Sequence, residues 1–259
     1  MALIFGSKTT IATGGISTTT VGTYTVHQFT TSANFTPATT GFVDVLLVGG
    51  GGGSGNYGPP VSQPEVPIHG GGGAGATLFK KMIPVIAGTP YPVVIGPGLS
   101  GNTTFTYSGI TTTAYGGGKG AFGNGNPNNP GVSSPFASGG GGGANGGSGG
   151  TGAGILGIGY AGGSGNYSGY INGGGGGGAG GAGSPAPSTP NQSAAGGPGV
   201  PITYFTGVSP NIVSIGGSGG TNPGGTVSAY GSGGTTSLPT FNPGNPAPGQ
   251  PGVAYIRYI

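Results

Sequence analysis

Runs of consecutive glycine constrain this chain more than any other feature of its sequence. Glycine supplies 71 of the 259 residues. The longest glycine-rich runs are Gly49–Gly53, Gly70–Gly73, Gly139–Gly154, Gly173–Gly183 and Gly216–Gly220. Within them the sequence divides into triplets, such as GGG, GGA, NGG, SGG and TGA from Gly139 onward. Three residues per turn is the period of the polyproline II helix, so the triplets predict polyglycine II helices.

A polyglycine II helix has no internal hydrogen bonds, so its N–H and C=O groups need partners in neighbouring segments. Close packing of several such helices requires glycine, because glycine has no Cβ. The runs directly adjoin apolar segments, as in VDVLLVGGGGGSG from Val43 to Gly55. This arrangement favours a bundle of polyglycine II helices fixed to a β core. The alternative is a set of flexible spacers, because ordering glycine costs the most backbone entropy.

Charge is scarce, which distinguishes the chain from typical disordered proteins and from nucleic-acid-binding proteins. Only 3% of residues are charged, and the formal net charge is +3. Disorder usually combines low hydrophobicity with high net charge, and nucleic-acid binding requires a basic patch. No apolar run approaches the roughly 18 residues of a membrane span. The apolar tetrad Ala2–Phe5 follows no basic residue, so no secretory signal is expected. We expect no nucleic-acid partner and no membrane insertion.

The apolar residues fall in segments that read as strands. Glycine and proline recur along most of the chain, and they cost about 1 and 3 kcal/mol in a helix interior. Segments rich in β-branched and aromatic residues predict strands near residues 24–36, at 43–48, on both sides of turns at Ala87–Pro90 and Ser108–Gly109, and at the end. The segment GFVDVLLVGG alternates only partly, which suits a strand buried on both faces. The predicted fold is all-β: a β-sandwich-like core with polyglycine II segments and essentially no α-helix. The predicted parts are an N-terminal arm or attachment segment (1–23), a β-rich core (24–118), a glycine-rich polyglycine II region with loops (119–248) and a C-terminal strand that returns to the core (249–259).

Residues that could support catalysis or bind a metal are few. Asp44, inside a predicted strand, and Glu65, in a proline-flanked loop, are the two carboxylates of the chain. A glycosidase needs two carboxyl groups about 5–10 Å apart, and a calcium site needs several oxygen ligands. We therefore predict a protein that is not an enzyme and that uses no cofactor or metal. His27 is predicted to be a half-exposed strand residue, and His69 a loop residue before a glycine run.

Aromatic residues in the segments between the glycine runs are the best candidates for contacts with another molecule. Tyrosine among Ser, Gly and Asn is typical of antibody binding loops, because its ring offers a large rigid surface at low entropic cost. The segment GYAGGSGNYSGY carries three tyrosines with few apolar neighbours. The other interpretation is that such rings pack on or cap the bundle. The predicted receptor-binding residues are Tyr57, Phe136, Tyr160, Asn166, Tyr167 and Tyr170.

An ordered set of segments resembles the glycine-rich domain of bacteriophage tail-fibre and adhesin proteins. The set comprises QFTTSANFTPATTGFVDVLLVGGGGGSG, then GGGGAGATLFKKMIPVIAGTPYPVVIGPG, then TTTAYGGGKG and finally GQPGVAYIRYI. The middle segment carries the family spacing at Gly88, Tyr91, Val93, Ile95, Gly96 and Gly98, and the last carries it from Gly252 to Ile256. The resemblance covers roughly residues 24–259.

The resemblance implies a structural protein of the virion that binds a host surface receptor at a fibre or tail tip. Its expected partners are other virion proteins, copies of itself, and a host surface protein or glycan. Its expected location is the extracellular virus particle, after synthesis in the host cytoplasm. Two alternatives remain: a capsid-decoration or head-fibre protein with a purely structural role, and an ice-binding protein that presents rows of Thr or Ala.

Overall fold

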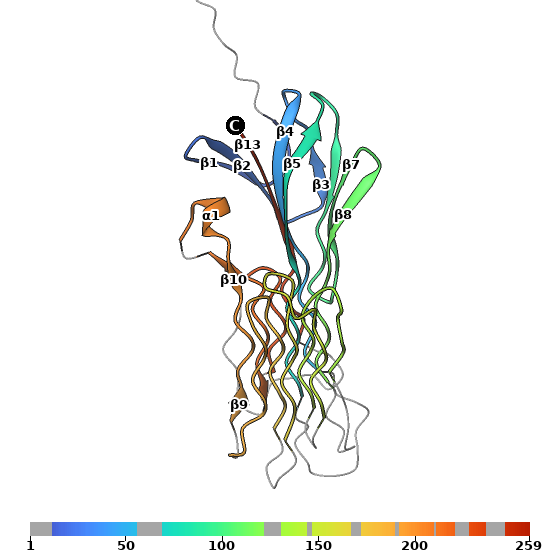
Figure 1. The fold of residues 1–259 in the computed structure, drawn as a ribbon, viewed down its shortest axis with the longest axis vertical. Coiled ribbons are helices and arrows are strands. Elements are labelled where there is room, and N and C mark those ends of the chain that lie inside the picture. The colour runs from blue at the N-terminus through green and yellow to red at the C-terminus, as the bar shows by residue number, and fades with distance from the viewer. Residues whose placement is uncertain are drawn as a thin grey trace, which may run out of the picture.

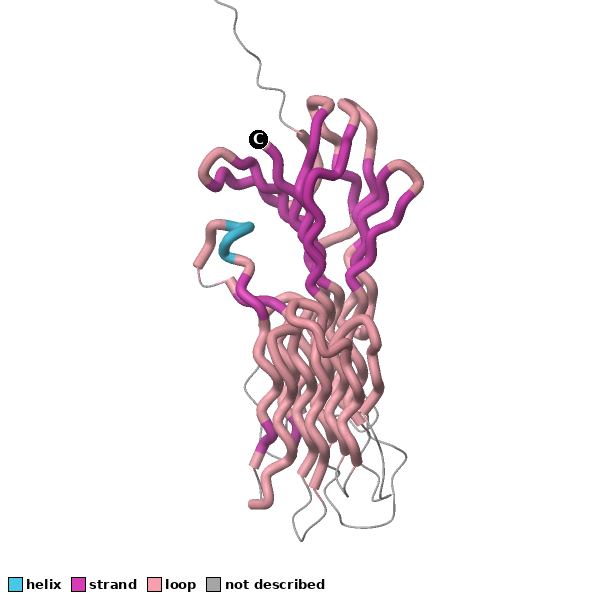
Figure 2. The backbone as a smooth tube through the Cα atoms, in the orientation of Figure 1, coloured by secondary structure: helices cyan, strands magenta, loops and turns pink. Residues whose placement is uncertain are grey.

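The protein is a rod with a β-sandwich at one end and a bundle of glycine-rich segments along the rest of its length (Figures 1 and 2). A computed structural model describes residues 12–55, 69–121, 131–143, 147–166, 172–189, 192–209, 211–220, 228–236 and 247–259. The predicted all-β fold is confirmed. The one helix in these ranges, α1, is the four-residue segment Thr203–Thr206.

The larger sheet of the sandwich has five antiparallel strands in the order β1-β2-β13-β4-β5. They are β1 (Ser17–Val21), β2 (Tyr24–Phe29), β13 (Val253–Tyr258), β4 (Gly41–Val48) and β5 (Thr77–Val85). The C-terminal strand therefore returns to the core and lies between β2 and β4. Strand β1 falls within the segment predicted as an arm and pairs with β2 along its whole length. Lys80 and Lys81 are exposed on β5, an edge strand, where lysine opposes pairing with another chain.

The smaller sheet has four antiparallel strands in the order β3-β6-β7-β8. They are β3 (Ala33–Phe35), β6 (Tyr91–Val94), β7 (Thr103–Tyr107) and β8 (Ile110–Ala114). The turn between β7 and β8 was predicted at Ser108–Gly109, and both residues have positive φ, 46° and 74°. Two positive φ values in a two-residue loop match the twist of a β-hairpin.

Two apolar clusters use the two faces of the five-stranded sheet. The first cluster lies between the sheets and includes Phe29, Phe35 and Phe105, all fully buried. The second lies on the other face of the larger sheet, where Leu46 and Val48 pack with Phe205. The predicted burial of β4 on both faces is thus confirmed. The second cluster is covered by an excursion from the bundle, residues 200–213, which consists of β10 (Val200–Pro201), α1 and β11 (Ile212–Val213).

The glycine runs are ordered, and their hydrogen bonds repeat every three residues. In the run 49–55, the N–H groups of Gly49, Gly52 and Gly55 donate to Ala76, Gly73 and Gly70 at 2.9, 2.8 and 3.0 Å. Gly51 and Ser54 instead donate to Gln250 and Ala247, both at 2.9 Å. On the third side, Gly50 and Gly53 accept from Gly117 and Gly120 at 3.0 and 2.9 Å. A threefold alternation of partners is the behaviour expected of a polyglycine II helix, so this run is not a flexible spacer.

The run 70–76 lies at the centre of the bundle and bonds to other runs on all sides. Its N–H groups donate to runs at 115–121, 174–177 and 231–234. Its carbonyls accept from runs at 49–55 and 138–141 and from Gly217. All residues from Gly70 to Ala76 are buried. Glycine is required here because a Cβ on Gly72 would lie 2.1 Å from the carbonyl oxygen of Gly52. A further pairing within the bundle joins β9 (Ser193–Ala194) to β12 (Gly219–Gly220).

Candidate functional site

The predicted receptor-binding residues do not form one cluster in the structure. Tyr160 and Phe136 lie at the end of the bundle nearest the sandwich, where Tyr160 accepts a hydrogen bond from Gly139 N–H at 3.0 Å. Asn166 lies two helical turns further along the same run, at the far end. Tyr57, Tyr167 and Tyr170 lie outside the described residues.

Phe136 belongs to an apolar collar where the bundle meets the sandwich. Its ring stacks on Tyr115, which follows β8, with centroids 4.8 Å apart. Ile155 and Leu156 are exposed on a neighbouring turn, whose Gly157 carbonyl accepts from Thr77 N–H at the start of β5. Ala153 N–H donates to Ala137 O at 3.0 Å and joins the two turns. Exposed apolar residues grouped in this way are typical of protein contact surfaces.

Asn166 is part of a clamp that joins three segments at the far end. Its N–H donates to Asn172 O at 3.0 Å, and its side-chain amide donates to Pro187 O at 3.2 Å. The Asn172 amide donates to Pro187 O at 2.9 Å and to Thr189 O at 2.8 Å. Asn166 is therefore partly buried and structurally engaged rather than free for contact.

Several described segments end side by side at this far end of the rod (Figure 2). Gly55 N–H donates to Gly70 O, and Gly70 N–H donates to Ala121 O. Gly55, Ala121 and Asn166, which are far apart in sequence, all lie at this end.

An ion pair within the five-stranded sheet, whose arginine also contacts the excursion 200–213, was not predicted. Arg257 on β13 lies directly opposite Asp44 on β4 and donates to its Oδ2 through Nε at 3.2 Å and Nη2 at 3.1 Å. Its guanidinium carbon lies 4.4 Å from the ring centroids of both Tyr24 and Phe205. Nη1 donates to Tyr204 O at 3.2 Å, in α1. These are the one Arg and the one Asp of the sequence, a signal that could have indicated the pairing.

His27 is buried, so its prediction as a half-exposed residue was wrong. It lies on the face of β2 that meets the smaller sheet, and its ring packs edge-on against Phe35, 5.5 Å away. Nδ1 is 2.7 Å from Gly14 O, and Nε2 is 3.2 Å from the Tyr258 hydroxyl. The Gly14 carbonyl can only accept, so Nδ1 carries a proton and donates to it, while Nε2 is hydrogen-bonded to the Tyr258 hydroxyl. Both ring nitrogens are satisfied, which allows a histidine in the core.

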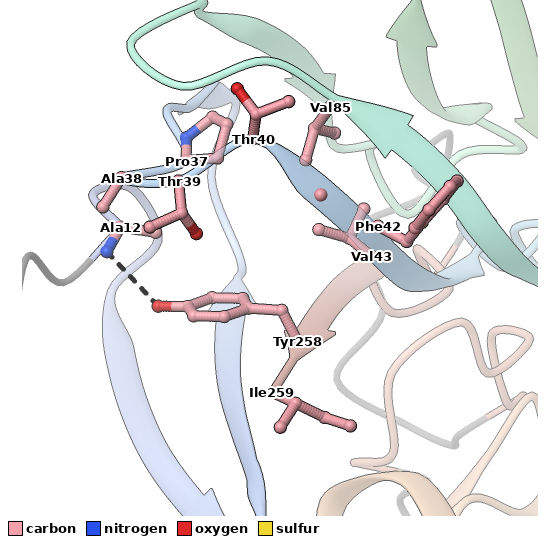
Figure 3. A pocket seen from close by; sticks show the side chains of 11 residues that line it. Ala12, Pro37, Ala38, Thr39, Thr40, Phe42, Val43, Val85, Tyr258 and Ile259 are labelled. Atoms are coloured by element: carbon pink, nitrogen blue, oxygen red, sulfur yellow. Dashed lines mark hydrogen bonds between the residues drawn. The ribbon is translucent and has the colours of Figure 1, made fainter.

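A pocket of about 130 Å³ opens at the free end of the sandwich (Figure 3). Phe42 at the start of β4, Val85 at the end of β5 and Tyr258 at the end of β13 line it. The turn before β4 and Ala12 complete its wall. Ligand pockets for drug-sized molecules are about 300–1,000 Å³, so this one can hold only a small group.

The described part of the chain contains no cluster of three or more His, Cys, Asp or Glu side chains placed to bind a metal ion. Asp44 is engaged by Arg257, and Glu65 lies outside the described residues. Within the described ranges, no helix has the length and apolar character needed to cross a membrane.

Comparison with known families agrees with this architecture. The sequence model of a family described as a glycine-rich domain matches residues 10–259. The chain belongs to this family. The match covers both the sandwich strands and the polyglycine runs, so the glycine-rich domain is the whole rod rather than the bundle alone. No curated protein sequence matches the chain.

The stability of this glycine-rich domain is expected to fall in mild acid because of His69, which precedes the central run. Burial lowers the pKa of His69 from 6.5 to about 4. The unfolded chain therefore binds a proton more readily than the folded chain. The contribution of neutral His69 to the free energy of unfolding is fully present above pH 6.5 and is lost as pH falls towards 4. We expect a loss of roughly 2 kcal/mol, or about 6 °C in Tm, allowing for partial exposure.

Thermal unfolding followed by circular dichroism at pH 7, 5 and 4 measures this effect. The His69→Gln variant is the matched comparison, because glutamine does not titrate and all other ionisable groups are retained. Its Tm should change much less than that of the wild type between pH 7 and 4. If Tm falls by the same amount in both proteins between pH 7 and 4, His69 is not the cause of the loss of stability in acid.

Proposed function

We propose that this glycine-rich domain is a non-enzymatic structural protein of a bacteriophage virion. It acts as a tail-fibre or tail-tip adhesin that binds a host surface receptor through segments between the polyglycine runs. The resemblance of its ordered segments to such proteins motivates the assignment to a virion. The observation that carries the proposal is that the two ends of the rod differ: one is the β-sandwich and the other is the end of the polyglycine bundle.

At the sandwich end lie the C-terminal strand β13 (Figure 1) and Ala12, whose N–H donates to the Tyr258 hydroxyl of that strand. At the other end the bundle brings together Gly55, Ala121 and Asn166, which are far apart in sequence and adjoin the segments between the polyglycine runs. A tip adhesin requires this division: one end joins the particle and the other presents several segments to a receptor. The hydrogen-bonded runs between them supply a rigid spacer, which lowers the entropic cost of binding.

The chemistry available for recognition is polar and uncharged. With 3% charged residues, binding relies on Tyr, Ser, Asn and Thr side chains together with backbone groups. Such surfaces combine rigid rings with adaptable hydrogen-bonding groups, as antibody loops do. They suit a glycan or a protein surface without strong charge.

A second candidate function is capsid decoration, and the apolar collar favours it. Phe136, Ile155 and Leu156 are more than half exposed at the junction of bundle and sandwich. A collar halfway along a rod is suited to contacts with neighbouring subunits in an assembly. In that case the far end binds no receptor, and the rod contacts neighbouring capsid subunits through the collar.

Binding to bacterial cells separates these functions. Fluorescently labelled protein is added to a panel of strains that includes the host of the encoding phage, and saturable binding to that host is expected. Alanine at both Tyr167 and Tyr170 should reduce binding at least tenfold. Alanine at Thr19 and Thr20, exposed on β1 at the opposite end, should leave it unchanged. Absence of binding, together with immunogold label over capsids instead of tail tips, would exclude the adhesin and support decoration.

A further inference from the structure

Strand β1 forms one edge of the five-stranded sheet, at the outer margin of the sandwich (Figure 1). Edge strands expose unpaired N–H and C=O groups, and proteins usually protect them with lysine, with a bulge or by keeping the strand short. The opposite edge, β5, has exposed Lys80 and Lys81 and a bulge in its pairing with β4. Strand β1 is paired without a register shift, its five residues carry no charge, and the first four are exposed. In the smaller sheet, β3 has only three residues, and β8 has two of its five residues buried.

The register of the β1–β2 hairpin shows which backbone groups of β1 face outward. The two strands are joined by the two-residue loop Gly22–Thr23, so the flanking pair Val21–Tyr24 is hydrogen-bonded. Hydrogen-bonded pairs alternate along an antiparallel ladder, so every second residue back from Val21 bonds to β2. The N–H and C=O groups of Thr18 and Thr20 therefore point away from the sheet. Within the described part of the chain, no backbone hydrogen bond reaches these groups.

We propose that β1 pairs antiparallel with β1 of a second copy of this chain, which joins the two five-stranded sheets across a two-fold axis. Thr18 lies opposite the partner's Thr20, and Thr20 lies opposite the partner's Thr18. Each of these two pairs exchanges two N–H···O hydrogen bonds. Thr19 lies at the axis, opposite its own counterpart. Because both copies use the same surface, the association closes at a dimer.

The sequence of β1 is complementary to itself in this register. Threonine lies opposite threonine at the three central positions, where such pairs stabilise a sheet and no like charges meet. Ile16, which is 60% exposed just before β1, comes beside the partner's Gly22. No atom lies within 4 Å of a Cβ at Gly22, so the isoleucine side chain has room there. This match of residues and space favours a second copy over a strand from another protein.

The contact is small, which sets its strength. Two five-residue strands bury less than the roughly 1,000 Å² of a stable interface, so the dimer is weak. Four backbone hydrogen bonds correspond to a Kd on the order of 1 mM. Copies held side by side in one assembly have effective concentrations in the millimolar range, where such pairing forms. This inference concerns the sandwich end alone and does not rest on the adhesin function.

Disulfide trapping tests the register, because the chain has no cysteine of its own. In Thr19→Cys the two Cα atoms face each other at about 4.5 Å, within the 4.4–6.8 Å that a disulfide requires. The matched control is Thr20→Cys, the next exposed residue of the same strand. Its Cα atom lies roughly 8–9 Å from its counterpart, because the two positions are offset by two residues. Circular dichroism first establishes that both variants are folded.

On oxidation with diamide near the expected Kd, the disulfide-linked dimer should form at least tenfold faster with Thr19→Cys than with Thr20→Cys. Non-reducing electrophoresis measures the two rates. Equal rates would show that the strands meet only by random collision, and would overturn the proposal.

Sedimentation equilibrium of the wild type should show a monomer–dimer equilibrium at concentrations approaching the millimolar range. Thr19→Lys places two lysines opposite each other at the axis and should weaken the dimer at least tenfold. Thr111→Lys, at an exposed position on the edge strand β8, should leave it unchanged. A loss of the dimer with Thr111→Lys instead would assign the contact to β8 and overturn the proposal. A wild type that stays monomeric would also overturn it and leave the β1 edge to a strand of another protein.

Discussion

Replacing Gly72 with alanine is expected to lower the free energy of unfolding by about 3–5 kcal/mol, enough to reduce Tm by roughly 10 °C or more. A Cβ at this position would lie 2.1 Å from Gly52 O and 2.8 Å from Gly234 N. Both contacts are with backbone, so no side chain can rotate away. The runs must move apart, and each displaced hydrogen bond adds about 1 kcal/mol to the cost.

The control is Gly41→Ala at the start of β4. No atom lies within 4 Å of a Cβ at Gly41, and its φ is not in the left-handed region. The two variants share the same chemical change and the same loss of backbone freedom in the unfolded chain. Thermal unfolding by circular dichroism should show Gly41→Ala close to the wild type. Similar Tm values for Gly72→Ala and Gly41→Ala would mean that the central run is not closely packed.

The Asp44→Ala variant is expected to be about 3 kcal/mol less stable, a loss near 10 °C in Tm. The side chains of Arg257 and Asp44 are 12% and 14% exposed, so removal of the carboxylate leaves a largely buried guanidinium unpaired. The substitution also removes Asp44 Oδ1, which accepts a hydrogen bond from Met82 N–H at 3.1 Å. Met82 has a φ of 54° at the bulge between β4 and β5, a conformation that a non-glycine residue adopts only with support.

Two further variants separate charge from packing at this ion pair. The double variant Asp44→Ala, Arg257→Met should recover part of the loss, because the unpaired charge is gone and Met can still pack on Tyr24 and Phe205. Lys80→Ala removes an exposed charge from the same sheet and should change stability by less than about 0.5 kcal/mol. If Asp44→Ala unfolds like Lys80→Ala, the ion pair contributes little.

The sequence predicted those features that depend on local pattern. The apolar segment Val43–Val48 indicated a strand buried on both faces, and the triplets indicated helices with three residues per turn. The pattern could not place the run 70–76 at the centre of the bundle, because all runs have nearly the same composition. Their arrangement depends on pairings over long sequence distances, such as Gly72 with Gly234.

Features that depend on the register between distant strands could also not be predicted from the sequence. The burial of His27 follows from its place opposite Ile256 on β13 and from the Gly14 carbonyl that reaches its ring. The pocket at the sandwich end combines the C-terminus, a turn and the residue where the N-terminal segment emerges. Two of the candidate receptor-binding residues, Asn166 and Phe136, lie at opposite ends of the bundle. A glycine-rich run spans the length of the bundle, so residues that are near in sequence can lie at different ends.

Four strands of the sandwich continue without interruption into the bundle. Strands β4 and β8 run on into residues 49–55 and 115–121, and residues 70–76 and 247–252 lead into β5 and β13. A pull applied along the rod therefore passes from one end to the other through covalent backbone. The hydrogen bonds between runs lie across the direction of force, so they are loaded together in shear instead of being opened one at a time. Such an arrangement transmits mechanical tension along the rod with little extension.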